Sequence, residues 1–365
     1  MMQISPETQL FIREHSSDDV RVLALQAKKY PDIDMPTAIT QIAGRKVAAE
    51  KIPSWWEIEK IWYPKHLSLE QCSSEITARY KARLLQGDSL TDLTGGFGID
   101  CSFLATGFKS ATYVERQEEL CEIAAHNFPV LNLNHINIKN EDGVTYLQAM
   151  SPVDCLFLDP ARRNEHGGKT VAISDCEPNV AELEELLLQK ANRVMIKLSP
   201  MLDLSLALKE LKQTQEVHIL SVNNECKELL ILLGQTSPAE ISIHCVNLFT
   251  KGTQKEQHFV FTREQEQCSE CTYTDSLETY LYEPNASLLK AGAFRSIAAA
   301  YPVRKLHPNS HLYTSDTFIE NFPGRIFRIV NQCSFNKKEV KENLADLKKA
   351  NVTVRNFPAT VAELR

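Results

Sequence analysis

The pattern of apolar and polar positions changes near residue 88. Before that point, apolar residues recur at helical spacing in three runs that prolines separate. The runs are VRVLALQAKKY (20–30), TAITQIAGRKVAAEKI (37–52) and SLEQCSSEITARYKARLLQ (68–86). We therefore predict a helical N-terminal domain over residues 1–88. Trp55, Trp56 and Trp62 all fall within it, and we interpret them as core anchors rather than as a stacking surface for a base.

From residue 89 onward, short β-type runs alternate with helix-type segments. The predicted strands are 89–93, 111–115, 135–138, 154–159, 193–198, 217–222 and 228–234. Apolar strands that alternate with helices form a parallel sheet covered on both faces, so this pattern predicts an α/β domain over 89–236. The last two strands are joined by NNECK and have the spacing of an antiparallel hairpin.

The remainder, 237–365, has a mixed α+β pattern. A hairpin (240–249 and 257–265) precedes a helical stretch over 285–300. Strand-like 324–330, helix-like 336–350 and strand-like 352–357 then predict a βαβ unit of ferredoxin-like character. The chain stops inside another helix-like run with no cap, which is the pattern of a truncated sequence.

Composition points to a globular protein of the cytoplasm. The 365 residues are 43% hydrophobic and 24% charged, and no apolar run approaches the roughly 20 residues that cross a bilayer. The N-terminus has no signal-peptide pattern. The ten cysteines are dispersed, and Cys155 and Cys245 lie in apolar runs, as reduced thiols do. Cys268 and Cys271 have half the spacing of a zinc knuckle, but nothing completes it, so we predict no metal and no membrane contact.

Charge is distributed unevenly along the chain. The net charge is −7, yet residues 285–365 carry 13 Lys and Arg against 6 Asp and Glu. This local balance of +7 leaves −14 on the preceding residues. The polarity excludes a protein that is basic over its whole surface and favours a basic C-terminal module.

A glycine-rich turn follows the first predicted β-strand. The sequence LTDLTGGFG (90–98) runs directly into a helix-like segment, which is typical of a cofactor-binding loop. Gly96 and Gly98 can adopt positive φ and have no Cβ, so backbone N–H groups can approach a ligand. The dinucleotide fingerprint GxGxxG is absent; the motif is DxTxGxG, with Asp92 and Thr94 in its first half.

Acidic residues follow the next two strands. Glu115 ends the second strand, 19 positions after Gly96, where a carboxylate can accept both ribose hydroxyls of a bound nucleoside. Asp142 follows the third strand and precedes Gly143. Carboxylates after successive strands meet at one sheet edge, so we expect a single cofactor site there.

The fourth strand ends in Asp159-Pro160-Ala161-Arg162-Arg163. Proline stiffens the chain just past a strand, so the carboxylate and backbone carbonyls can hold a planar amine, and positioning alone supplies much of the catalysis. Arg163 and Lys169 flank a Gly-containing loop suited to phosphate contacts. Lys197 and Ser199, at the end of the fifth strand, are further pocket-lining candidates.

These motifs resemble those of S-adenosylmethionine (SAM)-dependent methyltransferases that carry a THUMP-like C-terminal domain. The resemblance rests on LEQCSSEITARYKARL, DLTGGFGID, VER, LDPARR and EPNASLLKAGAF, and it covers most of the chain. It implies a Rossmann-like class I methyltransferase sheet with a helical N-terminal domain and an α+β C-terminal domain. It also implies SAM bound through Asp92, Thr94, Gly96, Gly98, Glu115 and Asp142. Asp159, Pro160 and Arg162 would then be the catalytic residues, and Arg163, Lys169, Lys197 and Ser199 would bind substrate.

The resemblance further implies an RNA substrate, with a base nitrogen of tRNA or rRNA as methyl acceptor. Two alternatives stay open: a small-molecule or DNA methyltransferase, and an RNA-binding protein with a degenerate cofactor fold. An NAD-dependent enzyme is disfavoured by the missing GxGxxG. Ala161 and Arg162 replace the second proline and the aromatic residue of the usual fourth motif, so the methylated atom stays undefined, as does the oligomeric state.

Overall fold

The computed structural model describes residues 4–162, 172–236, 238–345, 347, 349–355 and 357–364. The chain forms two compact units. The first comprises Met1–Gln215 with Leu229–Pro238, and the second comprises Glu216–Glu228 with Ala239–Arg365. The boundary between them runs through a β-hairpin, β8 (Thr214–Val222) and β9 (Glu225–Gly234).

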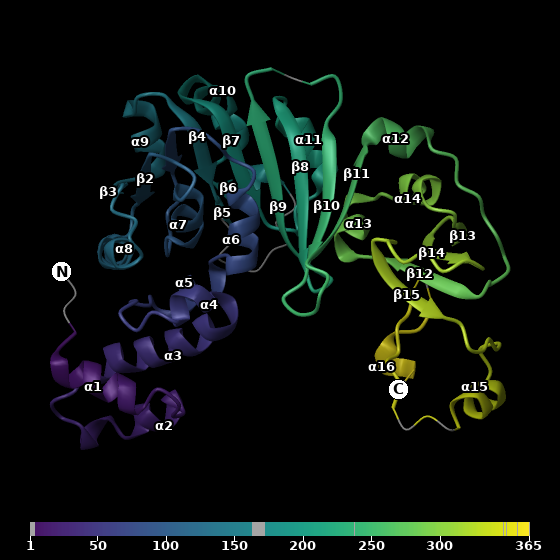
Figure 1. The fold of residues 1–365 in the computed structure, drawn as a ribbon, viewed down its shortest axis with the longest axis horizontal. Coiled ribbons are helices and arrows are strands. Elements are labelled where there is room, and N and C mark those ends of the chain that lie inside the picture. The colour runs from purple at the N-terminus through teal and green to yellow at the C-terminus, as the bar shows by residue number, and fades with distance from the viewer. Residues whose placement is uncertain are drawn as a thin grey trace. The chain divides into compact units, whose positions relative to one another are not determined.

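The N-terminal part of the first unit is helical, as its periodicity predicts (Figure 1). Its helices are α1 (Pro6–Glu14), α2 (Val20–Leu25), η1 (Ala27–Lys29), α3 (Met35–Lys51), α4 (Pro53–Trp56), α5 (His66–Gln71) and α6 (Glu75–Ala82). Ser5, Asp19 and Asp34 cap three of them through side-chain oxygens. The prediction of one continuous helix over 68–86 is wrong, because the chain breaks between α5 and α6 at Cys72–Ser74.

The remainder of the first unit is an α/β sheet. Its strands are β1 (Ser89–Asp92), β2 (Ser110–Glu115), β3 (Ile136–Asn140), β4 (Val153–Leu158), β7 (Ala191–Leu198) and β9, in the order β9-β7-β4-β1-β2-β3. All pairs are parallel except β7 with β9. Leu229–Leu233 are fully buried, which explains why the strands read as continuous apolar runs.

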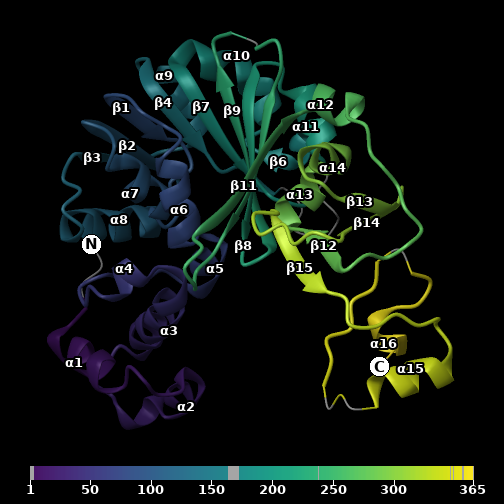
Figure 2. The same ribbon diagram turned by 45° about the vertical axis from the view of Figure 1, so that its right-hand side comes forward.

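Helices cover both faces of this sheet, as predicted. They are α7 (Ile99–Ala105), α8 (Glu118–Val130), α9 (Gly143–Ala149), α10 (Val180–Lys190) and α11 (Leu204–Glu210). Figures 1 and 2 show α6, α7 and α8 on one side of the strands, with α9 and α10 on the other. A short ribbon, β5 (Ala161–Arg162) with β6 (Cys176–Glu177), and η2 (Ile173–Asp175) follow the fourth strand. The predicted parallel α/β architecture is confirmed.

The second unit contains β8, β10 (Ser242–Leu248) and β11 (Glu256–Thr262), followed by α12 (Arg263–Cys268). β10 is parallel to β8 and antiparallel to β11. The hairpin between β8 and β9 turns at Asn223 and Asn224, which both adopt positive φ, as a tight two-residue turn requires.

A four-stranded antiparallel sheet completes the second unit. Its order is β13-β14-β12-β15, formed by β12 (Tyr280–Pro284), β13 (Arg304–His307), β14 (Ser310–Ser315) and β15 (Gly324–Arg328). The helices are α13 (Ala286–Ala291), α14 (Arg295–Ala300), α15 (Lys337–Leu344) and α16 (Val361–Leu364). Gly292, with φ of +77°, divides the predicted helix 285–300 in two. The predicted strand 352–357 is wrong: residues 349–355 form no strand.

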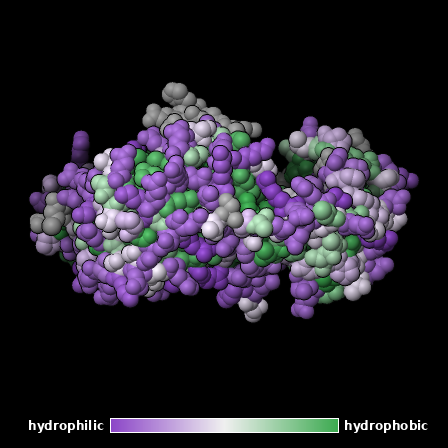
Figure 3. Space-filling view, turned by 90° about the horizontal axis from the view of Figure 1, so that it is seen from above, coloured by the Kyte–Doolittle hydropathy of each residue, from purple (hydrophilic) through white to green (hydrophobic). Residues whose placement is uncertain are grey.

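The described part of the chain has no helix that is both long and apolar enough to cross a membrane. Hydrophilic residues predominate on the face shown in Figure 3, with apolar residues in small groups between them. Among the described residues no disulfide joins any of the ten cysteines, and Cys155 and Cys245 are buried as predicted.

Candidate active site

Thr94 joins the glycine-rich turn to the end of the fourth strand. Its backbone N–H donates to Oδ1 of Asp92 at 2.9 Å, and its Oγ1 accepts from the backbone N–H of Asp159 at 2.6 Å. Because β1 and β4 are neighbouring parallel strands, their carboxyl ends lie side by side. The turn and the Asp159-Pro160 motif therefore share one sheet edge, as the sequence predicts.

The conformation of the turn explains its glycines. Gly96 and Gly98 have φ of +55° and +86°. Among the described residues, a Cβ added to Gly96 would meet only the Thr94 carbonyl oxygen, at 3.8 Å, so the turn faces open space there. A Cβ on Gly95 would lie 2.2 Å from the ring of Tyr113, which requires glycine for close packing.

Glu115 holds the turn from the second strand. Its Oε2 accepts from the Gly96 N–H and its Oε1 from the Gln117 N–H, each at 2.8 Å. Tyr113 adds a hydrogen bond from its hydroxyl to the Gly96 carbonyl at 2.5 Å. Each carboxylate oxygen of Glu115 retains a further lone pair, which can accept from a ligand hydroxyl.

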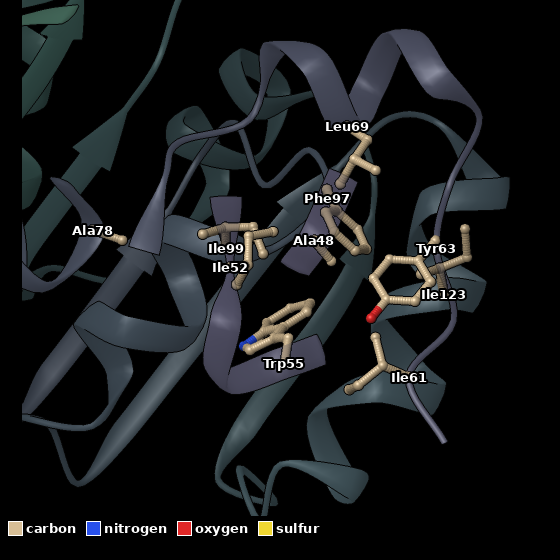
Figure 4. Packing of buried hydrophobic residues seen from close by; sticks show 10 residues of the cluster. All are labelled: Ala48, Ile52, Trp55, Ile61, Tyr63, Leu69, Ala78, Phe97, Ile99 and Ile123. Atoms are coloured by element: carbon tan, nitrogen blue, oxygen red, sulfur yellow. The ribbon is translucent and has the colours of Figure 1, made fainter. Parts of the chain in front are cut away.

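Phe97 anchors the turn to the N-terminal helices. Its ring packs edge-on against Trp55, with centroids 5.2 Å apart, and it points into an apolar cluster that also contains Tyr63 (Figure 4). Trp55 is 2% exposed, which confirms it as a core anchor, whereas Trp56 is 42% exposed. The N-terminal helices thus support the turn directly.

Asp142 is the N-cap of α9, where its Oδ1 accepts from the N–H groups of Val144 and Thr145, each at 3.0 Å. A Cβ on Gly143 would lie 2.2 Å from the carbonyl oxygen of Leu93. Glycine at this position therefore allows the end of the third strand to approach the glycine-rich turn, with Asp142 next to it.

Asp92 is a buried carboxyl group with an unused oxygen. It is 1% exposed, and its Oδ2 has no hydrogen-bond partner among the described residues. Burial raises its pKa well above the usual value, and the Thr94 N–H only partly opposes this effect. A buried, unpartnered acceptor beside an open turn suits a polar or cationic ligand group.

A chain of charges extends from Asp159 into the interior. Lys197 forms an ion pair with Oδ2 of Asp159 and lies 3.8 Å from Oδ2 of Asp100. Lys81, fully buried on α6, lies 2.9 Å from Oδ1 of Asp100. Ser73 donates to Asp100 at 2.7 Å and accepts from Lys81 at 2.8 Å.

Burial and the neighbouring lysines act in opposite directions on the pKa values of Asp100 and Asp159. Burial acts to raise the pKa of Asp100, but Lys81, Lys197 and Ser73 together hold it below its usual value. Burial raises the pKa of Asp159, and Lys197 acts in the opposite direction. The ammonium of Lys197 thus offsets only part of the effect of burial, and the pKa of Asp159 stays above its usual value.

A solved structure resembles this chain over its full length. It comes from Porphyromonas gingivalis W83 and is described as that of a "putative methyltransferase". Identity is 34%, the match covers 100% of this chain and 92% of that one, and the TM-score is 0.86. The chain belongs to the family of class I SAM-dependent methyltransferases with a THUMP-like C-terminal domain.

Two C-terminal segments of this methyltransferase match known domain families, in agreement with the family assignment. Residues 280–323 match a ferredoxin-like domain and 324–365 match a THUMP-like domain. The ferredoxin-like match therefore lies before the 324–357 segment in which we predicted it. No curated protein matches the sequence.

More distant structures also align with the methyltransferase. An rRNA methylase from Streptococcus thermophilus is 15% identical over 44% of this chain and 93% of its own, with a TM-score of 0.32. A SAM-dependent methyltransferase from Agrobacterium tumefaciens is 15% identical over 44% of this chain and 61% of its own, also at 0.32.

The remaining predicted site residues of the methyltransferase follow strands β4 and β7 along the chain. Pro160 is buried directly after β4. Ser199 forms the turn after β7, where its Oγ accepts from the Met201 N–H at 3.3 Å. The backbone of Arg162 belongs to β5, whereas Arg163 and Lys169 lie outside the described residues.

A cavity of about 210 Å³ lies at the other edge of the methyltransferase sheet. Its lining includes Ser89, Val153 and Ala191, the first residues of β1, β4 and β7. Because these strands are parallel, their first residues lie opposite the glycine-rich turn. This cavity is separate from the candidate site.

Sequence reasoning missed Ser73, Lys81 and Asp100. Asp100 lies two residues after Gly98 and could have been noticed as an acid in a helix that is otherwise apolar in its first turns. Lys81 gave no signal, because a lysine in a predicted helix is ordinarily solvated. Only the packing of α6 against α7 shows that it is buried.

Proposed function

We propose that this protein transfers the methyl group of SAM to a base nitrogen of tRNA or rRNA. The proposal rests above all on the double hydrogen bond of Thr94, which holds the glycine-rich turn and Asp159 together at one sheet edge. A cofactor in the turn and a base at Asp159 would consequently be neighbours.

The residues of the turn fit SAM. Open space beside Gly96 leaves room for the ligand, and the spare lone pairs of Glu115 suit the ribose hydroxyls. Asp142, the N-cap of α9, would accept from the adenine amine, and the unpartnered Oδ2 of Asp92 would bind the amino-acid end. When bound, SAM supplies an electrophilic methyl group on a positively charged sulfur.

Asp159 and Pro160 would hold the acceptor base. Lys197 occupies Oδ2 of Asp159, so Oδ1 and the neighbouring backbone carbonyl can accept from an exocyclic amine. The ion pair fixes the carboxylate and the Thr94 hydrogen bond fixes the backbone of Asp159 before substrate arrives, which is the main requirement when positioning supplies the catalysis. Arg162 would complete the catalytic group, and Arg163 and Lys169 would contact substrate phosphates.

The RNA substrate is supported by the THUMP-like match over 324–365 and by exposed lysines of the same region. The local charge balance of +7 overstates the number of cations that can bind RNA. Arg325 and Arg355 both pair with Glu283, Arg304 pairs with Glu278, and Lys305 is buried. Phosphate contacts therefore fall to exposed cations such as Lys338, Lys341 and Lys349.

Replacing Asp159 tests the proposed site. Asp159→Asn removes the charge but keeps the shape, so we expect methyl transfer to fall at least tenfold while the dissociation constant for S-adenosylhomocysteine changes less than threefold. The matched control is Asp88→Asn, which alters an exposed carboxylate paired with Lys109. Full turnover by the Asp159 variant would rule out its assigned role.

Mapping methylated nucleosides identifies the substrate. Total RNA from a strain lacking the gene is compared with RNA from its parent and from a strain complemented with the Asp159→Asn variant. We expect one modification to disappear in both the deletion and the variant strain. An unchanged RNA profile, combined with intact SAM binding, would direct attention to DNA or small-molecule acceptors.

A further inference from the structure

Three histidines and a glutamate gather on one face of the β8–β10–β11 strands in the second unit. Glu216 and His218 are two residues apart on β8, so their side chains emerge on the same face. His244 is the register partner of His218 across the parallel β8–β10 pair. His258 lies on β11, beside β10.

The imidazole and carboxylate groups are in contact. His218 Nε2 lies 3.2 Å from Oε2 of Glu216, and the His218 and His244 rings stack with centroids 4.3 Å apart. His244 Nδ1 lies 3.1 Å from His258 Nε2. One ligand atom from each of Glu216, His218 and His244 can be chosen so that all lie within 4.8 Å of one another.

These separations are near those of a coordinated metal. Bonds of about 2.0–2.1 Å to nitrogen and oxygen place tetrahedral ligand atoms roughly 3.3 Å apart. The 3.2 Å between His218 and Glu216 already meets this value. The remaining atoms need to close by about 1–1.5 Å, a shift that side-chain rotation of the half-buried His244 can supply.

We propose that Glu216, His218 and His244 bind one divalent first-row transition metal ion, with zinc as the occupant and the exposed His258 or water as the fourth ligand. Imidazole nitrogens with one carboxylate suit zinc and exclude the hard cations calcium and magnesium, which prefer all-oxygen sites.

The burial of the cluster agrees with this occupant. His218 is 2% exposed, so this side of the cluster is shielded from solvent, whereas His258 is exposed, so an ion can reach the cluster from that side.

Sequence spacing gave no sign of this group. Its members are spread over residues 216–258 on three strands, and only the sheet register brings them together. All four belong to the second unit, whereas the glycine-rich turn and Asp159 belong to the first. The proposed metal site therefore does not depend on the methyltransferase assignment.

Metal titration of the chelator-treated full-length protein tests the proposal. Calorimetry with Zn²⁺ should show one tight equivalent, and Co²⁺ should give the visible absorption of a nitrogen- and oxygen-bound tetrahedral ion. Cys268→Ser with Cys271→Ser provides the working background, because the exposed Cys268 and the partly buried Cys271 have a spacing that can also bind zinc. The absence of a tight equivalent in this background would overturn the proposal.

Single substitutions locate the ion. His218→Gln, His244→Gln and Glu216→Gln should each weaken zinc binding at least tenfold, whereas the matched control His307→Gln, a histidine of the same unit outside the cluster, should not. Glu216 is partly exposed, so its variant keeps the test valid if a buried histidine variant does not fold. Unchanged affinity in the Glu216 and His244 variants would refute the site.

Discussion

At the scale of single residues, the candidate site is a set of buried polar groups held by few partners. Asp92 has one satisfied oxygen and one without a partner in the described chain, and its neighbours Asp100, Asp159 and Glu115 raise its pKa further. A buried carboxylate in this position lowers the stability of the folded state unless a ligand or a proton neutralises its charge. We interpret Asp92 as a carboxyl group that a bound ligand compensates.

Asp92→Asn tests this interpretation through the pH dependence of stability. A carboxyl group whose pKa is raised on folding stabilises fully below its unfolded value, near 4, and loses that contribution as pH rises towards the folded value. The stability of the Asn variant relative to the wild type should increase above pH 4 by about 1.4 kcal/mol for each unit of the raised pKa. Urea unfolding without ligand, between pH 4 and 8, measures the difference. A difference independent of pH would show that Asp92 ionises normally.

At the scale of elements, the sheet was predictable and the interactions between elements were not. Strands such as β4 and β9 are apolar throughout, and their periodicity alone identifies them. The glycine-rich turn, Glu115 and Asp159 follow from their positions at strand ends. The sequence supplied these features because each depends on a few consecutive residues.

Features that depend on distant residues were missed. At the break at Cys72–Ser74, Ser73 forms hydrogen bonds with Asp100 and Lys81, which lie 27 and 8 positions further along the chain. Strands β12 and β13 are short and contain charged residues, and β14 is short and rich in polar residues, so alternation does not distinguish them. The strand predicted over 352–357 has suitable residues but no pairing partner in the described chain.

The Lys81–Asp100 pair should be essential for the stability of α6 against α7. Lys81→Met leaves Asp100 with less compensation in a buried position, and we expect a loss of about 3–5 kcal/mol in the free energy of unfolding. The double variant Lys81→Met, Asp100→Asn should lose less than the sum of the single variants. Denaturant unfolding of the four proteins measures this coupling, and strictly additive losses would contradict it.

At the scale of the whole molecule, the methyltransferase combines an acidic part with a basic C-terminal region. Several basic residues of this region already form ion pairs with Glu278 and Glu283. The cations that stay available include Lys338 and Lys341, three positions apart on α15 and therefore on one helical face.

Charge reversal on α15 tests RNA binding by this region. Lys338→Glu with Lys341→Glu should weaken RNA affinity severalfold and reduce the slope of log affinity against log salt by about 0.7–0.9 per lost phosphate contact. Lys109→Glu, at an exposed lysine of the first unit, is the control. Equal effects of both changes would mean that only net charge matters.

The account depends most on the glycine-rich turn and Asp159 forming one site. A crystal structure of the protein with S-adenosylhomocysteine tests this directly. We predict that the ribose hydroxyls bind Glu115, that the amino-acid end reaches Asp92, and that the sulfur faces Asp159. A ligand bound elsewhere, or a sulfur turned away from Asp159, would contradict the account.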